Sequence, residues 1–117
     1  MMIRPSPTDV LRALDEVCPG ARAVAMARDR TAPAASTRRV AMAVSRALGN
    51  SLSGTGRTFK RDHTTVRSAV RAYCDRQAAR HAEARGEADL FRNLITAALD
   101  VAQRRAAGGT FTSRGAA

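Results

Sequence analysis

The sequence has few aromatic residues and no tryptophan: aromatics make up only 3% of its 117 residues. Its apolar residues are mostly alanine, valine and leucine. Aromatic side chains favour strands, whereas alanine and leucine favour helices, so the composition predicts an all-α fold. A chain of this length can bury one modest core, which indicates a single domain.

Long hydrophobic runs are also absent. No segment approaches the roughly 18 apolar residues that cross a bilayer, and the first twenty residues contain three prolines and three acidic residues. We therefore expect no membrane contact and no signal peptide, and a reduced, cytoplasmic setting. Cys18 and Cys74 have no paired spacing, so two buried thiols are expected.

Motifs for catalysis, nucleotides and metals are missing as well. The only lysine, Lys60, is followed by Arg61, so no phosphate-binding loop of the GxxxxGK[ST] kind can form around it. His63 and His81 have no partner at metal-ligand spacing. We expect no catalytic residue, no metal, no cofactor and no nucleotide, and hence no enzyme.

Acidic residues are scarce in the middle of the chain. Residues 28–80 carry twelve basic and three acidic residues, whereas residues 1–27 and 81–117 are close to neutral. This segregation predicts a surface for a polyanion and a nucleoid-associated protein. Nineteen of the twenty basic residues are arginine, which suits bidentate recognition of phosphates and bases. A GC-rich genome would also favour arginine codons.

Apolar positions at helical spacing predict a compact domain of about six helices over residues 8–106. A flexible lead-in at 1–7 and a disordered tail at 107–117 are expected to flank it. The last helix is expected at 87–105, after a break near Gly86.

Three helices are predicted before the basic centre of the chain. The expected caps are Thr8 or Asp9 for the first helix and Ser36 or Thr37 for the third, with a loop at 31–35 before it. The residues expected to point inward from the short second helix are Ala23, Val24 and Ala27.

A helix-turn-helix is predicted next, from a short helix at 51–57, a turn at 58–61 and a long helix that begins at Asp62. The residues expected to pack inward are Leu52, Thr55, Gly56 and Phe59 from the first helix and Val66, Ala69, Val70 and Tyr73 from the second.

The first turn of the second helix carries Asp62, His63, Thr64 and Thr65. Such side chains can reach base edges when a helix N-terminus enters the major groove. An ordinary N-cap at Asp62, followed by surface threonines, would explain the same residues. The surrounding positive charge favours DNA reading.

The run from Arg61 to Val66, RDHTTV, resembles the signature of the C-terminal DNA-binding domain of the bacterial replication initiator DnaA. Similarity extends over about residues 8–105 and includes Arg39–Val44 and Asp89–Ile95. The resemblance implies a fold like that of DnaA domain IV and the Trp repressor. It also implies that double-stranded DNA containing a DnaA box, or a related site, is the partner.

The resemblance places Asp62, His63, Thr64 and Thr65 in the major groove. It places Arg30 in the adjacent minor groove, with Arg28 as an alternative. The phosphate contacts that we expect are Arg28, Arg38, Arg39, Ser51, Lys60, Arg61 and Arg67.

Three departures from the family pattern put the preferred DNA sequence in question. Lys60 alone stands where the family usually has two glycines, and the turn at Gly49 is one residue short. Ser53-Gly54-Thr55 replaces a frequent Pro-Glu-Ile. We also expect no ATPase domain, and so no ATP-driven initiator.

Three functions are compatible with these features. The first is a transcription regulator, for example an activator of a phage-derived or gene-transfer-agent-like cluster. The second is a replication modulator that competes for DnaA boxes at the origin. The third is a protein-binding adaptor. RNA polymerase or an architectural DNA-binding protein is left open as a further partner.

Overall fold

The computed structural model describes residues 3–28 and 30–108 of the chain. These residues form six helices and no strand, which confirms the predicted all-α fold. The helices are α1 (Pro7–Val17), α2 (Ala21–Met26), α3 (Ala32–Ala47), α4 (Leu52–Phe59), α5 (His63–Ala78) and α6 (Ala84–Gly108).

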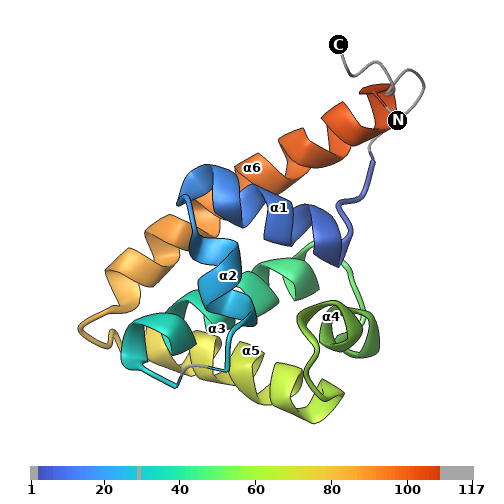
Figure 1. The fold of residues 1–117 in the computed structure, drawn as a ribbon. Coiled ribbons are helices and arrows are strands. Elements are labelled where there is room, and N and C mark those ends of the chain that lie inside the picture. Colours follow the sequence, from blue (N-terminus) through green and yellow to red (C-terminus); the bar gives the residue numbers. More distant parts are fainter. Residues whose placement is uncertain (1–2, 29, 109–117) are drawn as a thin grey trace.

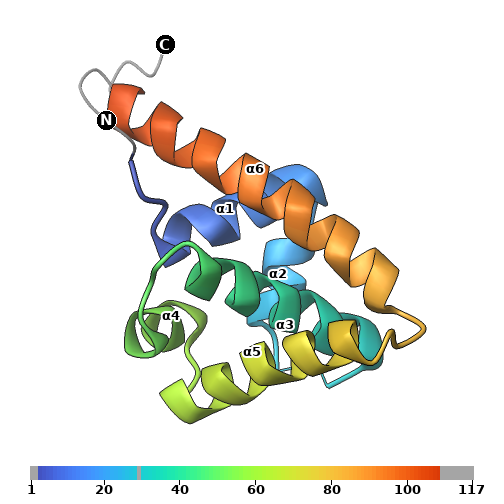
Figure 2. The ribbon, with the colours of Figure 1, turned by 180° about the vertical axis from the view of Figure 1, so that it is seen from behind.

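Helix α3 lies in the middle of the molecule (Figures 1 and 2). The antiparallel neighbours α1 and α6 lie on one side of it, and the α4–α5 pair lies on the other. Helix α6 is long enough to contact α1 with one half and α3 and α5 with the other. Helices α1 and α6 therefore pack against α3 on the side opposite the α4–α5 pair.

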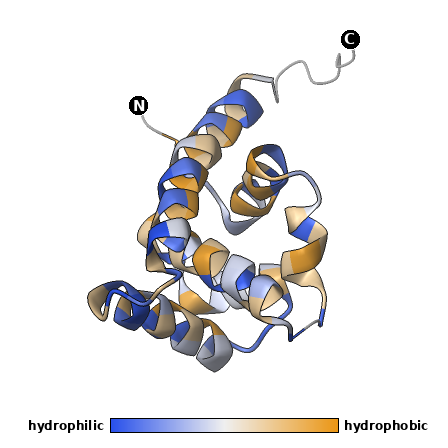
Figure 3. Cartoon of the chain, turned by 90° about the vertical axis from the view of Figure 1, so that its left-hand side faces the viewer, coloured by the Kyte–Doolittle hydropathy of each residue, from blue (hydrophilic) through white to orange (hydrophobic). Residues whose placement is uncertain are grey.

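The core forms where these helices meet. Leu11 and Leu14 of α1, Val44 of α3, Phe59 of α4 and Leu94 of α6 are at most 1% exposed. Apolar and polar residues recur in bands along the helices, as expected for helices with one buried face (Figure 3). Burial of these side chains is the main favourable term in the stability of such a domain.

The first helix begins earlier than predicted. Ser6 is its N-cap, and its hydroxyl accepts a hydrogen bond from the backbone N–H of Asp9 at 3.1 Å. The Asp9 carboxylate accepts in return from the N–H of Ser6 at 2.9 Å, which completes a capping box. The predicted caps Thr8 and Asp9 are wrong because Pro7 suits the first helical position, where no N–H is needed.

The second helix buries a different face from the one predicted. Ala21 and Ala25 are buried, while Ala23 and Ala27 are exposed and Val24 is 41% exposed. A helix of only six residues has too few apolar positions for its inward face to be assigned from spacing alone.

The third helix also begins earlier than predicted, at Ala32 with Thr31 as its N-cap. Pro33 lies in the first turn, where its missing N–H leaves no hydrogen bond unmade. The predicted caps Ser36 and Thr37 are therefore wrong. Both lie inside the helix, and the Thr37 hydroxyl donates to the carbonyl of Pro33 at 3.0 Å.

Near the end of the chain, the break lies between Ala78 and Ala84, and α6 continues through Gly86. The predicted break at Gly86 is wrong, because a single glycine in a long amphipathic helix lowers helix propensity without ending the helix. Helix α6 reaches Gly108, and the rest of the expected tail lies outside the described residues.

The two cysteines, Cys18 and Cys74, are exposed, which contradicts the prediction that they are buried. Cys18 caps the C-terminus of α1, and Cys74 lies one position off the apolar stripe of α5. Within the described part of the chain, no helix is both long and apolar enough to cross a membrane.

Candidate nucleic-acid interface

The turn between α4 and α5 is closed by a single residue in the left-handed conformation. Lys60 has φ 57° and ψ 45°, and the N–H of Arg61 donates to the carbonyl of Gly56 at 2.8 Å. A non-glycine residue in this region costs roughly 1 kcal/mol. Lys60 is thus the left-handed residue through which the chain turns from α4 into α5, where the resemblance to the DnaA domain predicts two glycines.

Gly56 allows the two helices to approach. A Cβ atom at this position would lie 2.6 Å from the carbonyl oxygen of Arg61, which is too close for a side chain. The predicted inward position of Gly56 is confirmed. The inward positions Thr55 and Phe59 are fully buried, and Leu52 packs partly buried against the core.

The first turn of α5 projects from the surface. Asp62 is the N-cap, and Asp62, His63, Thr64 and Thr65 are all exposed, whereas Val66 is fully buried. The Thr64 hydroxyl donates to the Asp62 carboxylate. This hydrogen bond is the largest effect on the pKa of Asp62, which lies below its usual value, so the carboxylate is ionised.

The basic loop between α2 and α3 lies beside this turn. Arg28 and Arg30 are exposed and line a shallow depression together with Arg38, Arg61 and Thr65. Residues that are more than thirty positions apart in the sequence therefore share one surface. Both candidates for the minor-groove arginine lie at the edge of the exposed first turn.

The seven expected phosphate contacts differ in what they touch. Arg28, Lys60 and Arg67 are exposed, and within the described residues their side chains have no acidic partner. Ser51 is exposed at the N-cap of α4, where its hydroxyl accepts from the N–H of Gly54 at 2.9 Å. The remaining three contacts, Arg38, Arg39 and Arg61, are bonded inside the protein.

Arg38 and Arg61 both donate to carbonyls at the end of α2. Arg39 turns the other way, toward Glu87 on α6, with an Nη2–Oε2 distance of 3.1 Å and a side chain that is only 16% exposed. Its guanidinium therefore lies in the interior between α3 and α6.

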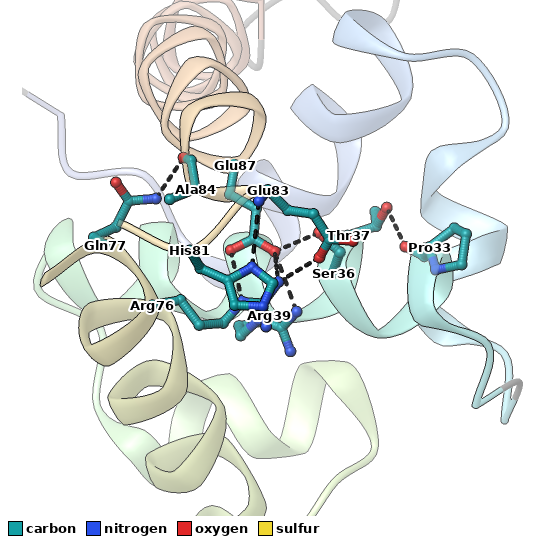
Figure 4. Close-up of polar contacts among 10 residues, drawn as sticks. All are labelled: Pro33, Ser36, Thr37, Arg39, Arg76, Gln77, His81, Glu83, Ala84 and Glu87. Atoms are coloured by element: carbon teal, nitrogen blue, oxygen red, sulfur yellow. Dashed lines mark hydrogen bonds and ion pairs between the residues drawn. The ribbon is translucent and has the colours of Figure 1, made fainter. Parts of the chain in front are cut away.

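Glu87 connects three helices (Figure 4). It is 3% exposed, accepts from the Ser36 hydroxyl at 2.7 Å and pairs with Arg39 and with Arg76 of α5, the latter at 3.3 Å. Burial alone would raise the pKa of Glu87, but these three donors together lower it below its usual value. The buried carboxylate is thus ionised and paired.

Sequence reasoning missed two residues at this surface, Ser53 and Arg57. They line a depression between α4 and the start of α5, together with Lys60, Asp62 and His63. Ser53 follows the N-cap by two positions and Arg57 by six, so both could have been found by extending the phosphate-contact search along the first helix of the pair.

A basic helix-turn-helix with an exposed, polar first turn on its second helix defines a class of DNA-binding domain. The family model described as the bacterial DnaA protein helix-turn-helix matches residues 21–72, so this segment of the chain is similar to that family. The family is a DNA-binding domain and not an enzymatic one. Comparisons with curated proteins and with solved structures found no match.

Proposed function

We propose that this protein binds double-stranded DNA in a sequence-specific manner and regulates transcription from the sites that it occupies. The observation that carries the proposal is the exposed first turn of α5, residues 62–65, beside an arginine loop with no acidic partner among the described residues. This arrangement supports simultaneous reading of a major groove and the neighbouring minor groove.

Each side chain of the first turn has a chemical role in this proposal. The ionised Asp62 accepts a hydrogen bond from the amino group of a cytosine. Thr64 and Thr65 offer a hydroxyl to a base or a methyl group to the methyl of a thymine, and His63 offers a ring N–H. Arg30 enters the minor groove, where a narrow groove attracts a guanidinium.

The exposed cations around this turn hold the DNA backbone. Arg28, Lys60 and Arg67 are the phosphate contacts that we retain, with Ser51 and Arg57 on α4. If these four cations and Arg30 neutralise about five phosphates in all, the logarithm of the binding constant falls with the logarithm of salt concentration with a slope of about −4.5. An affinity that did not change with salt would contradict this mechanism.

Selection of bound sequences from random duplex DNA tests the proposal directly. The wild-type protein is expected to enrich one motif, which is then compared with the DnaA box. A double variant, Thr64→Ala with Thr65→Ala, is expected to bind the enriched duplex about 100-fold more weakly, because two base contacts are lost. Thr96→Ala, at an exposed threonine on α6, is the matched control.

If the double variant bound the enriched duplex as tightly as the wild type, the assignment of the first turn would fail. The result would then favour a protein-binding adaptor.

The family match also supports a second candidate function, competition for DnaA boxes at a replication origin. Genome-wide occupancy separates the two candidates. Sites concentrated at promoters support transcription regulation, whereas sites concentrated at the origin support replication control.

A further inference from the structure

Two arginines from different helices converge on the end of α2. Arg38 of α3 donates from Nε to the carbonyl of Ala25 at 2.9 Å and from Nη2 to the carbonyl of Ala27 at 2.8 Å. Arg61 donates from Nη2 to the same carbonyl of Ala27, also at 2.8 Å. One backbone oxygen therefore accepts hydrogen bonds from both guanidinium groups.

The shared oxygen lies where α2 ends and the basic loop begins. Ala27 is the C-cap of α2, and the next residue, Arg28, begins the basic loop. The last carbonyls of a helix have no intrahelical partner and lie at the negative end of its dipole, which explains why two cations are tolerated there.

A second nitrogen of the Arg61 guanidinium donates to α4 of the helix-turn-helix. Its Nη1 donates to the carbonyl of Phe59 at 3.0 Å, and Asp62, the N-cap of α5, follows it directly. The planar guanidinium thus spans the gap between Phe59, the last residue of α4, and Ala27, the C-cap of α2. Arg38, Arg61 and the carbonyl of Ala27 connect the two elements that are proposed to enter the two grooves.

We propose that Arg61 and Arg38 are positioning residues that fix the basic loop against the first turn of α5, so that Arg30 and Thr65 meet the DNA in a constant register. The inference rests on the proposed function, since it assigns the two arginines to holding that site together. It replaces the phosphate contact expected for each of them.

The geometry favours this role over a phosphate contact for Arg61. Its donors face protein carbonyls in two directions, and it is only partly exposed. Lysine would keep the charge but presents a compact ammonium, which cannot bridge two separated carbonyls as the guanidinium fork does. The substitution Arg61→Lys therefore separates the bridge from the charge.

The experiment measures binding of full-length variants to the duplex enriched by the wild type, and to duplexes altered at single positions. Arg30→Ala identifies the base pairs that Arg30 senses. Arg61→Lys is expected to lose about tenfold in discrimination at those same base pairs. The double variant Arg30→Ala, Arg61→Lys is expected to discriminate at those base pairs as well as Arg30→Ala alone. The reason is that Arg30 can read them only when Arg61 fixes the basic loop.

The salt dependence gives an independent readout. Arg61→Lys is expected to leave the log–log slope unchanged, since no phosphate contact is removed. Arg92→Lys, at an exposed position on α6 outside the proposed DNA surface, is the matched control and is expected to keep both discrimination and slope. Arg38→Lys removes the hydrogen bond that α3 donates to the Ala27 carbonyl. It is expected to lose discrimination at the same base pairs.

Wild-type discrimination in both Arg61→Lys and Arg38→Lys would overturn the proposal. A uniform loss on all duplexes in Arg61→Ala, additive with Arg30→Ala and with a slope shallower by about 1, would also overturn it and restore a phosphate contact. These outcomes are distinct from failure of the proposed function. That failure would appear as no enriched motif for the wild type or as normal binding by the Thr64→Ala, Thr65→Ala variant.

Discussion

Among the described residues, most arginines of α6 pair with carboxylates, whereas in the matched segment, residues 21–72, Arg39 is the arginine that pairs with a carboxylate, Glu87. On α6, Arg105 pairs with the buried Asp9 at 2.8 Å, and Arg104 pairs with Glu16 of α1. Within the matched segment, Arg30 and Arg67 are exposed and have no acidic partner among the described residues. The segment carries eleven basic residues and only two acidic ones, so most of its cations cannot be paired locally.

This difference indicates which arginines are available for the proposed contact with DNA. Almost all basic residues in both regions are arginine and not lysine. This preference does not distinguish the two regions, and a GC-rich genome explains it equally well. Pairing does distinguish them. An arginine beside a carboxylate holds two helices together, whereas an unpaired, exposed arginine is available to a phosphate.

Removal of Glu87 is expected to have the largest effect, because it would turn an interior pair into unpaired charge. Glu87→Ala leaves Arg39 and Arg76 without their shared acceptor and is expected to lower the free energy of unfolding by about 3 kcal/mol. Urea denaturation measures this change. Asp89→Ala, which removes an exposed pair with Arg92, is the control and is expected to cost less than about 1 kcal/mol. Equal losses in the two variants would contradict the distinction.

Protonation of the buried carboxylates at low pH is expected to destabilise the protein less than Glu87→Ala does. A protonated side chain keeps its volume and some of its hydrogen bonds. The pKa values of Asp9 and Glu87 are below their usual range in the folded protein: burial raises both, and bonds from Arg105 and Ser6, or from Ser36, Arg39 and Arg76, outweigh it. Their contribution to stability is therefore complete above the unfolded pKa values and is lost as the pH falls through the folded ones.

Thermal unfolding at low salt, followed from neutral pH to below about pH 4, measures this loss. The Asp9→Asn, Glu87→Gln double variant is expected to have a flatter dependence on pH over the same interval. A variant as steep as the wild type would show that other carboxylates account for acid unfolding.

The smallest expected effect on stability, and the sharpest contrast in binding, comes from single exposed arginines. Arg67→Ala is expected to make the salt slope of DNA binding shallower by about 1 and to weaken binding on all sequences alike. Arg92→Ala, at an exposed arginine on α6 paired with Asp89, is expected to change neither the slope nor the affinity. Fluorescence anisotropy at several salt concentrations compares the two. A shallower slope for Arg92→Ala would extend the DNA surface to α6.

The helix-turn-helix could be predicted from the sequence because its determinants are local. The spacing of Val66 and Tyr73 gave the buried face of α5, and Gly56 marked the close approach of α4. The polar first turn follows from the same spacing. These features depend on residues within about twenty positions of one another, where helical periodicity is informative.

The features that were missed depend on distant partners. Arg39 pairs with Glu87 across 48 positions, and Arg105 pairs with Asp9 across 96. No local pattern indicates which arginine will meet which carboxylate, so Arg39 was grouped with its exposed neighbours. The early start of α1 could not be predicted for another reason. Proline is common in loops, but it is also favoured at the first position of a helix, where Pro7 lies.

The pairing of Glu87 with Arg39 has a consequence for how this domain is delimited. Arg39 lies within the segment that the family model matches, but its counter-ion comes from α6, outside that segment. The apolar side of α3 is likewise covered in part by α6, which contributes Leu94 to the same core. The packed unit is therefore larger than the segment that resembles a known family. A fragment cut to the recognisable motif would expose both a charge and a hydrophobic surface that the whole chain conceals.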